Sequence, residues 1–271
     1  MSTESTAAPF QTSRSRTAVA VGVLVSVVMI ARFPVWRVPG WLAFSRDAPQ
    51  PAMLTWKLAQ VVLAVFATMA ILRVRRRGAL EALGLLRPLA PAVLLGAVCS
   101  LPILGVALWV GAGANPHATA WGALRAAVGS GLGEEVLYRG LFFLVLYRYA
   151  RWPFWAAAIA NSGPWIVGHL YQASETGLSL LAGSAEVAVT FAVFGALAAW
   201  MLVSWDDNLW ILVTLHGLGS LWWYLFAQNG ENTVPLYGMS AWVMRAGLIA
   251  TAVALTLLRH RLPRVLAPRR R

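Results

Sequence analysis

Three short stretches place ionisable or hydroxyl side chains inside otherwise apolar sequence. These side chains are Glu134, Glu135, Arg139, His169, His216 and Ser220. A charged side chain at the centre of a bilayer costs about 3 kcal/mol or more, so each one needs a partner, a water-filled cavity or a function. Amide hydrolysis needs a base that activates water, a donor for the developing oxyanion and a proton for the leaving amine. A glutamate and two histidines in one cavity can supply all three without a covalent intermediate.

The two adjacent glutamates are expected to have different roles. Residues four apart share one face of a helix, so Glu135 and Arg139 are predicted to form an ion pair within a helix. Adjacent residues point about 100° apart, so Glu134 is expected to face elsewhere and has no partner nearby in the sequence. The spacing therefore predicts that Glu134 is the general base and that Glu135 and Arg139 support the site.

The composition predicts the elements that position these side chains. Of 271 residues, 59% are apolar and 12% are charged, and the mean hydropathy is +0.66, which excludes a water-soluble globule. The apolar residues form runs long enough to cross about 30 Å of hydrocarbon. We therefore predict an all-α, polytopic transmembrane helical bundle with about eight spans. The first follows residue 16, and the others lie near 52–72, 88–112, 131–150, 153–170, 185–205, 208–228 and 238–258.

The expected domain map is simple. Residues 1–16 are polar and predicted to be a disordered cytoplasmic segment, 17–258 a single transmembrane domain, and 259–271 a basic cytoplasmic tail. The first apolar run has no small-residue cleavage pattern and is predicted to be retained. Residues 111–131 leave one point open. A fourth helix that begins near Thr119 would place both glutamates near mid-membrane, whereas a start near Gly131 would place them near its outer end.

The charge pattern indicates membrane topology. The net charge is +12, but 21 of the 22 basic residues are arginines, and most lie between apolar runs or in the tail, so no nucleic-acid partner is expected. With both termini cytoplasmic, fifteen arginines lie inside, against five basic residues outside: Arg32, Arg37, Arg46, Lys57 and Arg125. The arginine excess favours a GC-rich bacterial source. The expected location is the cell membrane, which the chain crosses several times. Cys99 is the single cysteine, so no internal disulfide is expected.

The motifs resemble those of a known family. Glu134 to Arg139 matches the EExxxR motif of the CAAX-protease and bacteriocin-processing family of intramembrane proteases, also called Abi or CPBP. Trp165 to His169 resembles its FxxxH motif with Trp for Phe, and His216 to Ser220 resembles its HxxxN motif with Ser for Asn. The resemblance covers about residues 85–228, which we take as the motif-bearing core of the domain.

The resemblance implies a glutamate-dependent intramembrane endopeptidase with no cofactor. In this family the residues that correspond to Glu134 and His169 activate water, and those that correspond to His216 and Ser220 stabilise the oxyanion. A serine offers one donor on a shorter arm than asparagine, so Ser220 is the least certain correspondence. The expected partners are the lipid bilayer and a peptide or membrane-protein substrate, and the oligomeric state stays open.

Three other interpretations of the same residues remain. Glu134, His169 and His216 can be zinc ligands from three helices, although the chain has no HExxH motif. Ser162 lies before His169 and can be considered as a serine nucleophile, although the chain has no GxSG motif. Buried polar residues also serve as structural links in a non-catalytic membrane scaffold or as a proton relay in a transporter.

Overall fold

The computed structural model describes residues 15–37, 50–176, 178–226 and 239–261. Most of the expected terminal segments 1–16 and 259–271 therefore lie outside the described residues. All regular structure in the described ranges is helical, which confirms the all-α prediction. The main elements are α1 (Arg16–Arg37), α3 (Gln50–Leu72), α4 (Arg76–Ala82), α5 (Leu89–Trp109), α6 (Ala120–Leu124), η1 (Arg125–Leu144), α7 (Val145–Arg148), α8 (Phe154–His169), η2 (Leu170–Glu175), α9 (Leu180–Ser204), α10 (Leu209–Phe226) and α11 (Met239–Leu257).

Within the described residues, four helices are long and apolar enough to cross a membrane, namely α3, α5, α9 and α10. Two shorter apolar helices cover Arg16–Ala31 and Ala241–Leu257. These helices support a multi-pass membrane protein, while the expected count of eight spans is not confirmed. One reason is that α8 has only 16 residues. Another is that η1 carries charged residues, so its composition does not resemble that of a lipid-facing helix.

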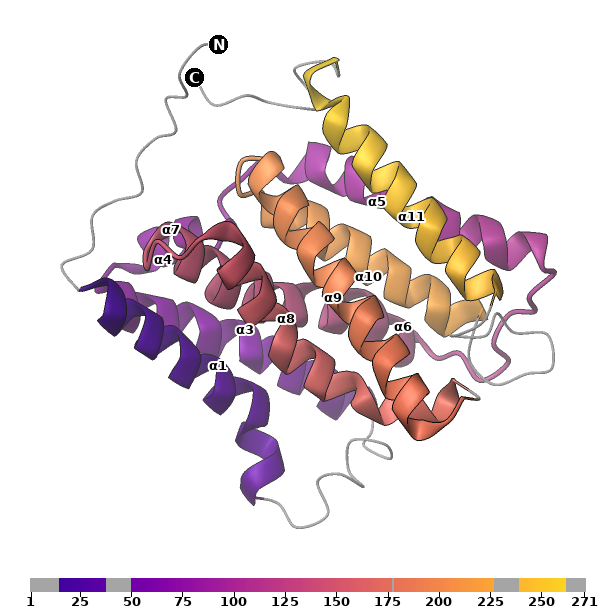
Figure 1. Ribbon diagram of the computed structural model, residues 1–271, viewed down its shortest axis with the longest axis horizontal. Helices are drawn as coiled ribbons and strands as arrows, with labels where there is room; N and C mark the ends of the chain where they lie inside the picture. Colours follow the sequence, from indigo (N-terminus) through magenta and orange to yellow (C-terminus); the bar gives the residue numbers. More distant parts are fainter. Residues whose placement is uncertain (1–14, 38–49, 177, 227–238, 262–271) are drawn as a thin grey trace.

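The helix η1 occupies the centre of the bundle. It packs between α3 and α10, while α5 lies against α10 and α11 lies against α5. The helix α1 packs on the outer side of α3, and α8 and α9 lie against one another and also contact η1. Figure 1 shows α1 at one end of this arrangement and α5 with α11 at the other. The candidate residues on η1 are thus enclosed by neighbouring helices.

The fourth expected span begins at the earlier of the two possible positions. Thr119 caps the helix through Oγ1, which accepts a hydrogen bond from the backbone nitrogen of Gly122 at 3.0 Å. Helical structure then runs without a break from residue 120 to residue 148, with fourteen residues before Glu134 and fourteen after it. Residues 125–144 have the wider π-type hydrogen bonding. Glu134 therefore lies midway along the helix.

Two glycines allow η1 and α10 to cross at backbone contact. A Cβ atom on Gly131 would lie 2.5 Å from the carbonyl oxygen of Val213 and 2.9 Å from Cα of Gly217. A Cβ atom on Gly217 would collide with the carbonyl oxygen of Ala127. Small residues permit such close approach of helices in membranes. The crossing lies beside His216 and one turn before Glu135, so it sets the distance between these two side chains.

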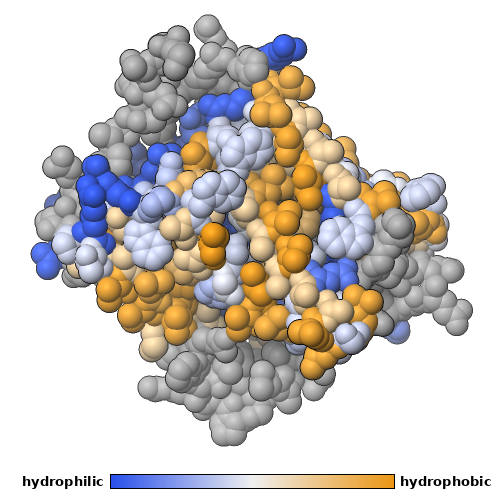
Figure 2. All heavy atoms as spheres, in the orientation of Figure 1, coloured by the Kyte–Doolittle hydropathy of each residue, from blue (hydrophilic) through white to orange (hydrophobic). Residues whose placement is uncertain are grey.

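Apolar side chains cover much of the surface of the bundle. In Figure 2 they spread over the face formed by α9 and α11 and over α1, while hydrophilic side chains gather near α4 and α7. The polar end is tied by Arg148, whose Nη2 donates to Oδ1 of Asp207 at 2.9 Å. This distribution is the one expected for a bundle that exposes its sides to hydrocarbon and its ends to water.

Candidate active site

Glu135 is the centre of a buried polar cluster. Its Oε1 accepts a hydrogen bond from Nη1 of Arg139 at 3.2 Å, which confirms the predicted ion pair within the helix. The same oxygen lies 2.7 Å from Nδ1 of His216 on α10. The guanidinium carbon of Arg139 lies 4.0 Å from the centre of the Trp165 ring, a cation–π contact with α8. Glu135 and Arg139 therefore link three helices.

Glu134 is paired, so the expectation of an unpaired carboxylate is wrong. Its Oε1 lies 2.8 Å from Nζ of Lys57 on α3, and its Oε2 accepts a hydrogen bond from Nε1 of Trp165 at 3.2 Å. Spacing along one helix could not predict the first contact, because Lys57 precedes Glu134 by 77 residues. Lys57 was counted among the charges on the outer side, near the start of the expected span 52–72; it lies within α3, and its side chain is 22% exposed.

Glu134 and Glu135 also converge, although adjacent residues had been expected to face different groups. Nε2 of His216 lies 3.9 Å from Oε2 of Glu134, while Nδ1 of the same ring contacts Glu135. A single imidazole therefore lies between both carboxylates. Because a carboxylate only accepts, Nδ1 of His216 carries a hydrogen. A second proton on Nε2 would be stabilised by Glu134 and would make this atom a donor.

His169 ends α8 and has a defined tautomer. Its Nδ1 lies 2.7 Å from the carbonyl oxygen of Trp165. A carbonyl oxygen only accepts, so Nδ1 carries the hydrogen and Nε2 of the neutral ring keeps its lone pair. The ring stacks on Phe191 of α9, with centroids 4.2 Å apart. His169 is thus held in an orientation that suits it to accept a proton at Nε2.

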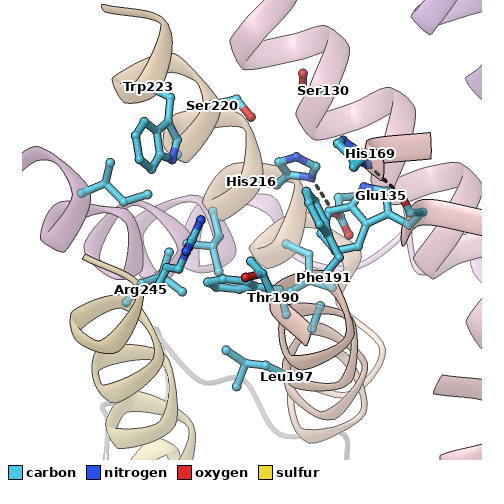
Figure 3. A pocket seen from close by; sticks show the side chains of 18 of the residues that line it. Ser130, Glu135, His169, Thr190, Phe191, Leu197, His216, Ser220, Trp223 and Arg245 are labelled. Carbon is cyan, nitrogen blue, oxygen red and sulfur yellow. Dashed lines mark hydrogen bonds and ion pairs between the residues drawn. The ribbon is translucent and has the colours of Figure 1, made fainter. Parts of the chain in front are cut away.

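A cavity of about 360 Å³ lies next to these groups. Its polar wall includes Glu135, Trp165, His169 and His216, and Ser220 lies one helical turn beyond His216 (Figure 3). The rest of the lining is mostly apolar. It includes Phe191, Phe194, Leu197, Met244 and Leu248, together with Arg245. The cavity thus combines room for apolar side chains with a cluster of proton-transfer groups.

Two predicted site residues are less directly placed. Glu134 does not line the cavity, but it contacts Trp165 and His216, which do. Ser220 lines the cavity without a hydrogen bond to any other residue in the part of the chain that the structure describes. Arg125, expected outside the spans, lies in η1 and also lines the cavity.

The groups required by the alternative interpretations were also located. Ser162 donates from Oγ to the carbonyl oxygen of Ala158 at 3.0 Å, is buried, and does not line the cavity. Cys99 is free and buried in α5. Within residues 15–37, 50–176, 178–226 and 239–261, no group of three or more His, Cys, Asp or Glu side chains is arranged to hold a metal ion. Because Ser162 is buried and does not line the cavity, the serine interpretation has no support from geometry.

Residues 116–222 match the family model described as Rce1-like, type II CAAX prenyl endopeptidase. The matched segment contains all three motifs, which confirms the family resemblance inferred from them. Comparisons with curated proteins and with solved structures gave no match. The family similarity and the apolar helices together support a membrane protein with peptidase activity.

Two contacts of Glu134 were missed from the sequence. Trp165 was treated only as a departure from the Phe of the family motif, but its indole nitrogen reaches Glu134. Lys57 was considered only as one of the basic residues on the outer side of the membrane. One available signal was that Lys57 is the single lysine among 22 basic residues. It also lies outside the matched segment, so the motifs gave no reason to consider it.

Proposed function

We propose that the protein is an intramembrane endopeptidase that hydrolyses a peptide bond of a membrane-associated peptide or protein with activated water. One observation carries the proposal: His169 and His216 line one cavity from two helices, and Glu134 on a third helix contacts Trp165 and His216 of its polar wall. Trp165 joins two of these groups, because its indole nitrogen contacts Glu134 and its carbonyl oxygen contacts His169.

In the proposed mechanism, Glu134 and His169 bind and activate the water. Its oxygen attacks the carbonyl carbon of the scissile bond while a proton passes to Glu134 Oε2 or His169 Nε2. The carbon–nitrogen bond then breaks, and the same proton is delivered to the leaving amine. The products are a carboxylic acid and an amine, which exchange the second proton of the water to become a carboxylate and an ammonium, and no bond to the enzyme forms at any stage.

The remaining site residues stabilise charge and geometry. The protonated Nε2 of His216 is the proposed oxyanion donor, and Ser220 is a weaker second donor. Glu135 fixes the ring of His216 through the contact with Nδ1 at 2.7 Å. Arg139 neutralises Glu135 in an environment where an isolated charge would be costly.

The assignment of Glu134 as the base follows from accessibility and bonding. Its side chain is 13% exposed, whereas that of Glu135 is 3% exposed. Glu135 is held by both Arg139 and His216, so its role is to orient those side chains. Proton transfer requires a carboxylate oxygen that is not already held by other groups, and Glu134, although it does not line the cavity, has the more exposed side chain.

The proposal is tested by comparing protein N-termini in cells that express the wild type, Glu134→Gln or Glu81→Gln at equal membrane levels. Glu81 is an exposed carboxylate on α4 and serves as the matched control. New termini present with the wild type and Glu81→Gln, but absent with Glu134→Gln, are expected and would identify the substrate. Equal new termini in all three samples would contradict a catalytic role of Glu134. The absence of new termini in every sample would favour the scaffold interpretation.

We also propose that the bundle crosses the cell membrane eight times with both termini in the cytoplasm. The arginine distribution supports this orientation in part. Of the five basic residues assigned to the outside, four lie within helices and do not count as loop charges, namely Arg32, Arg37, Lys57 and Arg125. A C-terminal reporter that is active only in the cytoplasm provides the test, and an inactive reporter on a fully inserted protein would contradict it.

A further inference from the structure

The single lysine of the chain lies against the proposed catalytic glutamate. Of 22 basic residues, only Lys57 is not an arginine. Its Nζ lies 2.8 Å from Oε1 of Glu134, across the contact between α3 and η1. The side chain is 22% exposed and that of Glu134 is 13% exposed, so the pair is largely shielded from solvent. The position of this lysine is therefore a specific feature of the site.

The helix contact is shaped to admit the lysine side chain. Two glycines one turn apart on η1, Gly129 and Gly133, face Lys57. A Cβ atom on Gly133 would lie 3.1 Å from Cβ of Lys57, 3.3 Å from its Cδ and 3.0 Å from its carbonyl oxygen. A Cβ atom on Gly129 would lie 3.5 Å from Cγ of Lys57. The aliphatic stem therefore runs along a side-chain-free strip of η1 that ends at Glu134.

The contact also determines which oxygen of Glu134 serves the reaction. Oε1 is taken by the ammonium of Lys57, whereas Oε2 faces Trp165 and His216, both of which line the cavity. An ammonium is a compact point charge, so it can hold one carboxylate oxygen and leave the other free. A planar guanidinium fork would instead engage both oxygens.

We infer that Lys57 is a positioning residue for the reaction, which fixes Glu134 through Oε1 and leaves its Oε2 directed toward Trp165 and His216. This inference rests on the proposed function. Lys57 takes no part in the proton transfer: the proton removed from water passes to the leaving amine by way of Glu134 or His169. The helix α3 is thereby part of the active site, although it lies outside the segment 116–222 that matches the family.

The first test restores the cation chemically. In a Cys99→Ala background, Lys57→Cys is expected to lower kcat about 10- to 100-fold with KM unchanged, because one hydrogen bond to a charged group is lost. Alkylation with 2-bromoethylamine rebuilds an ammonium on a side chain of nearly the same length and is expected to restore most of kcat. Alkylation with iodoacetamide fills similar space without charge and is expected to leave kcat low. Mass spectrometry measures the extent of each modification.

The second test measures the contact without a substrate. Reductive methylation with ¹³C-formaldehyde labels the amino terminus and one lysine, so NMR of the purified protein in detergent has a single lysine signal. This signal is expected to shift in Glu134→Gln and to stay in place in Glu81→Gln. An unchanged signal in Glu134→Gln would show that the two groups are not in contact and would overturn the inference.

The outcomes separate this inference from the proposed function. If Glu134→Gln is inactive while unmodified Lys57→Cys has wild-type kcat, the inference about Lys57 fails and the proposed function stands. Equal rescue by both alkylating reagents would reduce Lys57 to a packing role and would also overturn it. If Glu134→Gln retains full activity, the proposed function itself fails, and the role of Lys57 fails with it.

Discussion

The indole nitrogen of Trp165 donates a hydrogen bond to Oε2 of Glu134 at 3.2 Å, while the carbonyl oxygen of the same residue lies 2.7 Å from Nδ1 of His169. One residue of α8 thus orients both groups that are proposed to activate water. Phenylalanine at this position would keep the carbonyl contact but not the indole contact. The departure from the FxxxH motif therefore adds a donor to the site.

Trp165→Phe is expected to lower kcat about 10- to 100-fold, because it removes one hydrogen bond to a charged carboxylate. The aromatic ring remains, so the edge-to-face contact with Phe191 and the contact with Arg139 are largely kept. Trp155→Phe is the matched control, since Trp155 lies on the same helix and is 66% exposed. Steady-state kinetics of both variants provide the measurement. Wild-type kcat in Trp165→Phe would mean that the indole hydrogen bond has no role in catalysis.

His169→Ala is expected to lower kcat by about 100- to 10,000-fold, the usual contribution of a general base. The fixed tautomer leaves Nε2 as the acceptor, and alanine has no acceptor there. His117→Ala is the control, because His117 is exposed and outside the site. Single-turnover rates distinguish a chemical defect from slow product release. Similar rates for the two variants would exclude His169 from the chemistry.

Much of the fold was predictable because apolar run length alone determines where helices form in a membrane. The helices α3, α5 and α10 begin and end within a few residues of the expected positions. The start of the fourth helix was not predictable from hydropathy, because residues 111–131 are rich in glycine and polar residues. There the hydrogen bond from Gly122 to the side chain of Thr119 determines the boundary.

The site was predictable to the extent that it depends on spacing along one helix. The ion pair of Glu135 and Arg139 follows from their separation by four residues. Contacts between helices were not predictable, because they depend on which faces pack together. The pairing of Glu134 with Lys57 depends on α3 lying against the glycine side of η1. The position of His216 between two carboxylates depends likewise on the crossing of η1 and α10.

Arg139→Met is expected to destabilise the protein by about 3 to 5 kcal/mol, because it leaves Glu135 buried without its cationic partner. Arg259→Met is the control. Arg259 forms a partly exposed pair with Asp206 at 3.3 Å, and such pairs contribute about 0 to 1 kcal/mol. Thermal unfolding in detergent provides the comparison. Equal losses of Tm in the two variants would contradict a structural role of the buried pair.

Ser220→Asn is expected to raise kcat, because the longer amide extends a second donor into the cavity beside His216. A fully engaged oxyanion donor contributes about 3 to 4 kcal/mol, so even partial engagement gives a gain of about tenfold. Ser220→Ala is expected to change kcat little, since the serine hydroxyl is too short to reach the oxyanion well. If Ser220→Ala is as slow as His216→Ala, the serine is already an effective donor and the prediction is wrong.

Activity is expected to persist in 1,10-phenanthroline and in EDTA, in contrast to a zinc protease with the same ligands. Any metal bound by Glu134 would have to compete with the ammonium of Lys57 at 2.8 Å from Oε1. Nδ1 of His216 is already engaged by Glu135, which leaves only Nε2 for a metal. The measurement is the initial rate after prolonged incubation with each chelator, with a known zinc protease treated in parallel. Loss of activity that returns on addition of zinc would replace the glutamate and histidine mechanism with a metal-dependent one.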